Sequence, residues 1–116
     1  MDKRKRGNFA EDYACVLLEK NGYKIIERNF YTPFSEIDII AIKDDCLILV
    51  EVKARWGTKF GRPEEAVNSR KLYKIKRAGD LYYKKNKGLP KRVRIDVVSL
   101  ILKKGNVLSE KIIKVY

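Results

Sequence analysis

Residues 36–55 read EIDIIAIKDDCLILVEVKAR, and this stretch determines the predicted fold because it contains two strands and the turn between them. Apolar and β-branched residues dominate both halves, as is typical of strands, and Asp44-Asp45 is a short polar turn. The second half is apolar enough to be a central strand. We therefore expect an antiparallel hairpin in the middle of the fold.

The sequence before this hairpin predicts a helix and a further strand. Asn8 and Glu11 have the spacing of an N-terminal capping box, an apolar stripe follows, and Gly22 is a typical stop signal. These signals predict a helix at about residues 9–21. The run at 23–30 predicts a strand, which makes a three-stranded antiparallel meander with the hairpin.

After the hairpin, the pattern first becomes helical and then returns to strands. Pro63 is tolerated in a first helical turn, and the apolar residues that follow recur at helical spacing, which predicts one helix from about Pro63 to Asn86. Runs at 93–102 and 107–116 predict two more strands, joined by a turn. The expected fold is α/β, with the order α-β-β-β-α-β-β and a mixed sheet.

Composition indicates one domain and excludes several chemistries. A chain of 116 residues supports one core, so we expect a single domain over 1–116, with 1–6 as a mobile basic tail. The absence of histidine excludes Ser-His-Asp hydrolysis and His-ligated zinc. No apolar run reaches the roughly 20 residues of a membrane span, and the start of the chain lacks the apolar region of a signal peptide. We therefore expect a cytoplasmic protein without a membrane partner.

Four charged residues converge if the hairpin has the register set by its turn. With Lys43 opposite Cys46, Asp38 lies opposite Glu51 and Glu36 lies opposite Lys53, all on one face of the sheet. At an effective dielectric constant near 20, two carboxylates roughly 5 Å apart repel each other by about 3 kcal/mol. Some compensation is therefore required.

Two interpretations of this charged group remain open. In one, a divalent cation compensates the carboxylates, and their oxygen ligands favour Mg²⁺ or Mn²⁺ over zinc. In the other, the residues line a solvated face, and Glu36 and Lys53 form an ordinary cross-strand ion pair. Glu51 favours the first, because a carboxylate that interrupts a central apolar strand is costly unless it is paired or coordinating.

The same residues carry a family resemblance. Asp38 followed by Glu51-Val52-Lys53 resembles the PD-(D/E)xK nuclease signature, and the predicted element order resembles the restriction-endonuclease-like core. The chain as a whole is similar to the YraN-like family of uncharacterised bacterial proteins. The matching motifs are Gly7-x-x-Ala10-Glu11-x-x-Ala14, Arg28-Asn29, Glu36-Ile37-Asp38-Ile39-Ile40-Ala41, Glu51-Val52-Lys53-Ala54-Arg55, Phe60-Gly61-x-Pro63-x-Glu65-Ala66-Val67, Lys71 and Arg94-x-Asp96-Val97-Val98.

This resemblance implies a fold related to archaeal Holliday-junction resolvases, with catalytic residues at four positions. These are Glu11, Asp38, Glu51 and Lys53. The two strand carboxylates would hold Mg²⁺ or Mn²⁺, with the Val52 carbonyl as a third ligand and Glu11 bound directly or through water, while Lys53 orients a water or supports the leaving phosphate. Glu36 is expected in the outer shell, and the capping box remains an alternative role for Glu11.

The surface charge favours a polyanionic partner. The chain has 27 Lys+Arg against 15 Asp+Glu, a formal net charge of +12, and the predicted second helix is rich in basic residues. The alternative for such a stripe is a solvated face that serves solubility. The candidate nucleic-acid-binding residues are Arg55, Arg70, Lys71, Lys74, Arg77, Lys84 and Lys85.

Together these patterns predict a metal-dependent endonuclease that acts on DNA, on branched or flapped structures rather than on a specific sequence. Cutting both strands symmetrically would require a homodimer. Two alternatives remain. One is a non-catalytic nucleic-acid-binding module of the same fold, and the other is a small basic RNA- or ribosome-associated protein.

Overall fold

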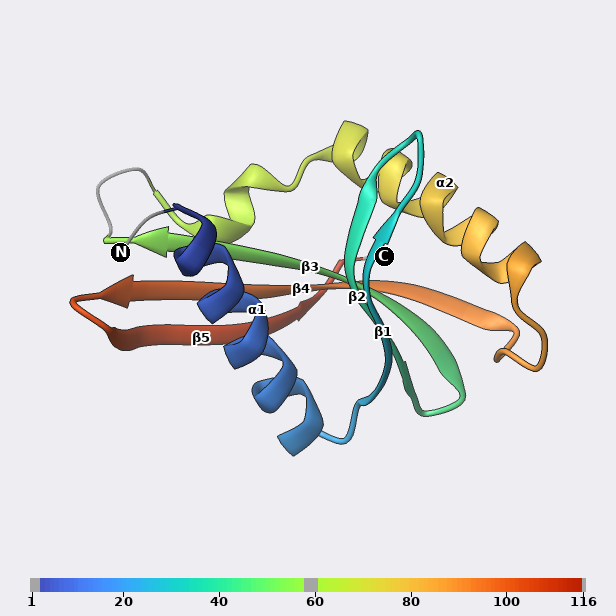
Figure 1. The fold of residues 1–116 in the computed structure, drawn as a ribbon, viewed down its shortest axis with the longest axis horizontal. Helices are drawn as coiled ribbons and strands as arrows, with labels where there is room; N and C mark the ends of the chain where they lie inside the picture. Colours follow the sequence, from blue (N-terminus) through green and yellow to red (C-terminus); the bar gives the residue numbers. More distant parts are fainter. Residues whose placement is uncertain (1–2, 58–60, 116) are drawn as a thin grey trace.

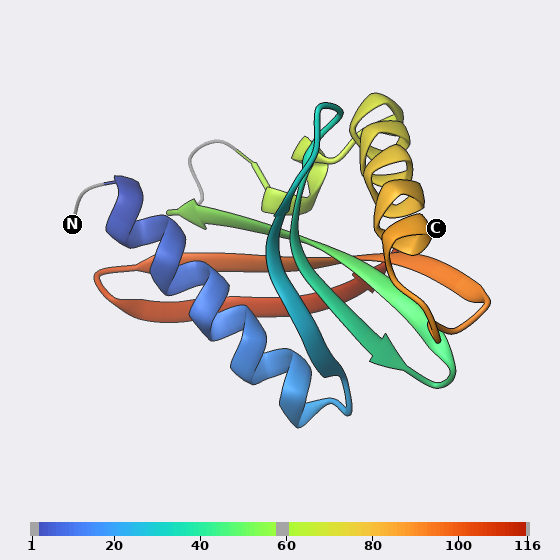
Figure 2. The same cartoon turned by 45° about the vertical axis from the view of Figure 1, so that its right-hand side comes forward.

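Two α-helices pack on opposite faces of one five-stranded sheet in the computed structural model, which describes residues 3–57 and 61–115 (Figures 1 and 2). The observed order confirms the predicted α-β-β-β-α-β-β arrangement, with one additional short 3₁₀ helix. The elements are α1 (Lys3–Lys20), β1 (Lys24–Tyr31), β2 (Glu36–Lys43), β3 (Cys46–Trp56), η1 (Pro63–Ala66), α2 (Ser69–Lys85), β4 (Arg92–Lys103) and β5 (Asn106–Lys114).

The sheet is mixed, as predicted, and its strands lie in sequence order. β1, β2 and β3 form the antiparallel meander, α2 carries the chain over to β4, which is parallel to β3, and β5 returns antiparallel. The β2–β3 turn is formed by Asp44 and Asp45, both with positive φ (50° and 59°), as two-residue hairpin turns require. Its register pairs Lys43 with Cys46, as expected.

β3 is buried on both faces, which explains why its first half is continuously apolar. Ile48 and Val50 belong to the core under α1, whereas Leu49 belongs to the core under α2. Gly79 allows α2 to approach closely, because a Cβ at this position would collide with Leu49. The same alternation places the odd-numbered residues that follow, beginning with Glu51, on the α2 face.

The first helix is longer than the sequence pattern indicates. It begins at Lys3, so Asn8 lies inside the helix and the prediction that it caps the N-terminus is wrong. Glu11 therefore has no capping-box role, and that alternative explanation for it is removed. Of the expected basic tail, residues 3–6 belong to α1, while residues 1–2 lie outside the described part of the chain.

The second predicted helix is divided in two. η1 ends at Ala66, and α2 begins only after Asn68, whose extended backbone (φ −113°) interrupts the helical path. The Asn68 side chain accepts a hydrogen bond from the Lys71 N–H at 3.0 Å, which is a regular N-cap. A single helix over 63–86 was therefore the wrong prediction, because the cap at Asn68 starts a new helix.

Both cysteines of the chain, Cys15 and Cys46, are buried and free. Across the described residues, none of the helices has both the length and the apolar content that crossing a membrane would take.

Candidate functional site

The site lies at a fork where β2 and β3 separate. Their ladder runs up to the pair Ile39–Val50, beyond which β2 continues along β1 while β3 continues along β4 (Figure 1). Asp38 is the first residue of β2 past the fork, and its Oδ2 accepts a hydrogen bond from the Val52 N–H at 2.7 Å. The Asp38 carboxylate thus accepts a hydrogen bond that a backbone carbonyl would accept if the β2–β3 ladder continued. This bond holds the Asp38 side chain between the two strands.

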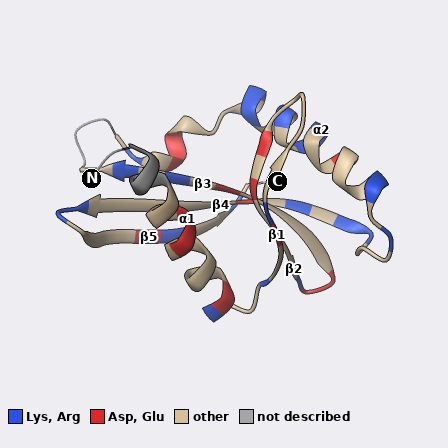
Figure 3. Ribbon diagram, viewed as in Figure 1, with Lys and Arg blue, Asp and Glu red and all other residues tan. Residues whose placement is uncertain are grey.

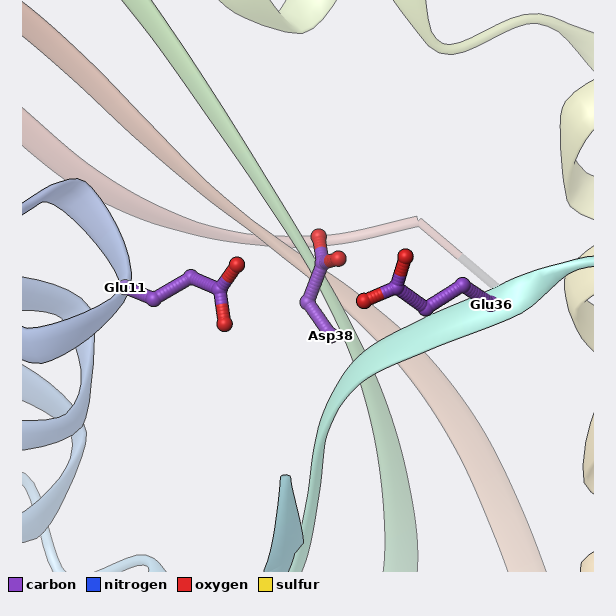
Figure 4. A group of neighbouring side chains, drawn as sticks. All are labelled: Glu11, Glu36 and Asp38. Carbon is purple, nitrogen blue, oxygen red and sulfur yellow. The ribbon is translucent and has the colours of Figure 1, made fainter. Parts of the chain in front are cut away.

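Three carboxylates meet at this fork. Glu11 reaches in from α1, and Glu36 and Asp38 project from β2, with one oxygen from each lying within 4.8 Å of the others (Figure 4). All three side chains are partly buried. We call Glu11, Glu36 and Asp38 the acidic cluster. The sequence analysis expected Glu36 to lie outside the direct metal ligands. In the structure its carboxylate lies together with those of Glu11 and Asp38.

Asn29 connects two members of the acidic cluster. It lies within β1 with a positive φ of 53°, a conformation that asparagine tolerates better than most residues. With the amide orientation assigned from the hydrogen-bonding network, its nitrogen donates to Glu11 Oε1 at 2.9 Å and to Glu36 Oε1 at 2.8 Å. The only sequence signal for this role is the Arg28-Asn29 motif, which carries no information about spatial neighbours.

The electrostatics of the acidic cluster oppose full ionisation. Burial, and next the charge of Glu51, raise the pKa of Asp38 to about 7, although the Val52 N–H acts in the opposite direction. Burial also raises the pKa of Glu11, while Arg28, whose guanidinium lies 3.8 Å from Glu11 Oε1, lowers it. The protein therefore holds these carboxylates together against their mutual repulsion.

Glu51 is the most buried of the predicted site carboxylates. Its side chain is 6% exposed, and its Oε1 lies 3.4 Å from Lys53 Nζ and 3.6 Å from Lys71 Nζ. Its Oε2 is buried and has no hydrogen-bond partner, which is costly for an isolated acceptor. Its charge nevertheless raises the pKa of Asp38, although the predicted Asp38–Glu51 pair is not part of the β2–β3 ladder, which ends at Ile39–Val50.

Lys53 does not have its predicted partner. Within the described part of the chain its ion pair is with Glu51 on the same strand, not with Glu36 across the hairpin. The reason is the fork, because β3 there pairs with β4 and Lys53 lies opposite Ser99. The expected cross-strand ion pair with Glu36 is therefore wrong.

The residues present fit a divalent cation. The three clustered carboxylates offer the oxygen ligands that Mg²⁺ and Mn²⁺ prefer, and Glu36 takes the place in this group that the sequence analysis gave to Glu51. Arg28 pairs with Glu11, whereas neither Glu36 nor Asp38 forms an ion pair with another described residue. Glu11, Glu36 and Asp38 would hold the ion, with Glu51 beside them.

The remaining predicted site residues lie on two elements. Arg55 follows Glu51 and Lys53 on the same face of β3, and its buried Nε has no hydrogen-bond partner. Lys71 is half-buried and reaches Glu51, so it belongs to the site as well as to the basic surface. Figure 3 shows Lys and Arg spaced along α2. The exposed predicted residues of this helix are Arg70, Lys74, Arg77, Lys84 and Lys85.

Comparison with known proteins places the chain in a family. The sequence profile of the uncharacterised protein family UPF0102 matches residues 10–100. A UPF0102 protein of Syntrophomonas wolfei is 42% identical over 97% of this chain and 98% of its own length. The UPF0102 protein of Dictyoglomus thermophilum is 42% identical over 94% and 93%, and that of Caldicellulosiruptor saccharolyticus is 38% identical over 98% of each. The chain therefore belongs to the uncharacterised protein family UPF0102.

Proposed function

We propose that this protein is a cytoplasmic endonuclease that binds DNA and hydrolyses its phosphodiester bonds with the help of Mg²⁺ or Mn²⁺. One observation carries the proposal. Three carboxylate oxygens, from Glu11, Glu36 and Asp38, lie within 4.8 Å of one another, and the charge of Glu51, which is paired with Lys53 at 3.4 Å, acts on Asp38. Clustered carboxylates with a lysine beside them suit a cation-assisted attack of water on a phosphodiester.

The residues of the chain divide this work among them. A bound divalent cation would supply a more acidic water and would neutralise negative charge on the phosphate. Glu11, Glu36 and Asp38 hold that cation, and Asn29 keeps two of these carboxylates in place through its amide. Lys53, anchored by Glu51, offers a fixed positive charge to the phosphate oxygens as negative charge grows on them.

The basic residues of α2 would hold the rest of the substrate. Their exposed side chains suit phosphate contacts, which give affinity without reading the base sequence. DNA with branches or flaps is the substrate that we favour over RNA. Cleavage of both strands of a symmetric substrate would require a homodimer, each copy contributing one site.

Cleavage of labelled DNA tests the proposal. The wild-type protein is incubated with flapped, branched, single-stranded and fully paired DNA in Mg²⁺, in Mn²⁺ and in EDTA, next to the variants Asp38→Asn and Lys53→Ala. We expect cutting by the wild type only with metal, and a loss of about 100-fold or more in each variant while DNA binding persists. Lys20→Ala, at the exposed end of α1, is the control that keeps full activity.

The same experiment identifies the alternatives. DNA binding without any cutting under all metal conditions favours a non-catalytic module of this fold. Preferential binding of RNA favours an RNA- or ribosome-associated protein. Undiminished cutting by both Asp38→Asn and Lys53→Ala contradicts the assignment of the active site.

A further inference from the structure

The tip of the β1–β2 hairpin presents aromatic side chains to solvent. Tyr31, the last residue of β1, is 72% exposed, and Phe34 in the following loop is 39% exposed. Exposed rings next to each other on a protruding hairpin are unfavourable for solubility and suggest a binding role. No local sequence pattern singles them out, because aromatic residues at a strand end or in a turn also occur as packing residues.

The loop is rigid enough to present these rings in a fixed position. The Thr32 hydroxyl oxygen accepts hydrogen bonds from the backbone N–H groups of Phe34 (3.1 Å) and Ser35 (3.0 Å), and the hydroxyl donates to the Ser35 carbonyl at 2.7 Å. The Thr32 N–H also donates to that carbonyl at 3.0 Å. The tip is therefore a closed turn whose conformation does not need to be ordered when a ligand binds.

One side of the tip is braced by α2. The guanidinium of Arg77 lies over the Phe34 ring, 4.4 Å from its centroid, and its Nη1 donates to the Tyr73 hydroxyl at 2.9 Å. Both views of the fold show the hairpin tip beside α2 (Figures 1 and 2). Phe34 is thus occupied by this contact, which leaves Tyr31 as the freely accessible ring of the tip.

Tyr31 also has a defined position relative to the acidic cluster. It pairs with Glu36 across β1 and β2, and directly opposed residues in an antiparallel pair point to the same face. Glu36 points into the acidic cluster (Figure 4). The Tyr31 ring therefore lies on the cluster side of the hairpin, directly opposite one member of the acidic cluster.

We propose that Tyr31 is a stacking platform for an unpaired nucleobase adjacent to the phosphodiester held at the acidic cluster. The inference rests on the proposed function and specifies its substrate class as DNA with a single-stranded segment at a branch or flap. In a continuous duplex the bases are stacked on one another and offer no free face. An unpaired base can stack on tyrosine without any sequence preference.

Binding measurements in EDTA, where no cutting is expected, test this inference. A flapped DNA that carries 2-aminopurine at the first unpaired position and a fully paired duplex of the same length are titrated with wild type, Tyr31→Ala, Tyr31→Phe and Tyr83→Ala. Tyr83, an exposed tyrosine near the end of α2, is the matched control. Wild type is expected to quench the 2-aminopurine and to bind the flapped DNA more tightly than the duplex.

The variants give distinct expected results. Tyr31→Ala should bind the flapped DNA about 5- to 100-fold more weakly, with no quenching and unchanged duplex binding, whereas Tyr31→Phe and Tyr83→Ala behave as wild type. Equal affinity of Tyr31→Ala and wild type for the flapped DNA overturns the inference and leaves the proposed nuclease function standing. Absence of binding to either DNA by the wild type overturns both.

Discussion

Asp38 links the electrostatics of the site to its expected metal dependence. Its pKa is raised to about 7 by burial and by Glu51, so at pH 6 most molecules carry a proton that a metal ion must displace. The ionised fraction rises about tenfold from pH 6 to pH 8. We therefore expect Mn²⁺ affinity to rise by about that factor, measured by titration calorimetry at both pH values. The same affinity at pH 6 and pH 8 would contradict a role for Asp38 as a ligand.

Without metal, the same carboxyl group works against folding at neutral pH. Because its pKa is raised from the ordinary value of 3.8 to about 7, its stabilising contribution is complete below pH 3.8 and is lost as the pH rises through 7. In EDTA, Asp38→Asn should raise the Tm at pH 8 by more than about 5 °C and should have little effect at pH 4. Thermal denaturation followed by circular dichroism measures both. A variant less stable than wild type at pH 8 would show that the ionised form is satisfied without metal.

The neighbourhood of Asp38 and Glu51 was predictable, but the complete site was not. Strand alternation and a two-residue turn are local rules, and they predict that these two carboxylates interact, although the β2–β3 ladder ends at Ile39–Val50, one pair short of the predicted Asp38–Glu51 pair. Asn29 contributes by joining Glu11 of α1 to Glu36 of β2, and Lys71 contributes because α2 passes close to Glu51. Such contacts join segments that are distant in sequence, so no local pattern indicates them.

Helix α2 contributes a cation to the buried carboxylate of β3. Lys71 Nζ lies 3.6 Å from Glu51 Oε1, and removing one partner of a mostly buried pair leaves charge uncompensated. In EDTA, Lys71→Gln should therefore lower the stability by about 1–2 kcal/mol in urea denaturation, whereas Lys74→Gln, one turn away and exposed, changes it little. Mn²⁺ should bind Lys71→Gln at least about threefold more tightly, because one positive charge fewer opposes the ion. Weaker Mn²⁺ binding would contradict this competition.

The start of α2 depends on one side chain. Asn68 accepts the Lys71 N–H at 3.0 Å, and removing such a cap costs about 1 kcal/mol. For a domain of this size we expect Asn68→Ala to lower the Tm by roughly 4 °C, while Asn68→Asp, which keeps the acceptor, retains the wild-type value. Differential scanning calorimetry compares the three proteins. A Tm unchanged in Asn68→Ala would show that the helix start is held by tertiary packing alone.

Prediction at the level of elements succeeded where the signal was periodic and failed at helix ends. The apolar run of β3 and the Asp44-Asp45 turn predict the central hairpin without ambiguity. Capping signals are weaker, because Asn8 and Asn68 are the same residue type and only the second one caps a helix. Asn68 has an extended backbone at the start of α2, whereas Asn8 lies inside a helix that already begins at Lys3.

The whole molecule combines a local concentration of negative charge with a basic surface. Four carboxylates, those of the acidic cluster and Glu51, lie at the fork of the sheet, although the chain carries a net charge of +12. A uniformly basic surface would attract polyanions without orienting them. The combination directs a polyanion to the protein and leaves one place where a cation is needed before a phosphate can approach.

The net charge makes DNA affinity dependent on salt, and the arrangement of the charges determines which residues contribute. If α2 contacts phosphates, the slope of log K against log salt concentration falls by about one unit for each contact removed. We expect Lys74→Ala combined with Lys84→Ala to reduce the slope by about two, because both side chains are exposed on α2.

The control is Lys20→Ala combined with Lys24→Ala, where α1 ends and β1 begins, away from α2 (Figure 3). This control removes the same charge and should leave the slope unchanged. Fluorescence anisotropy with duplex DNA from 50 to 200 mM salt is the measurement. Equal reductions by the two double variants would mean that DNA responds to total charge, and that α2 is not the binding surface.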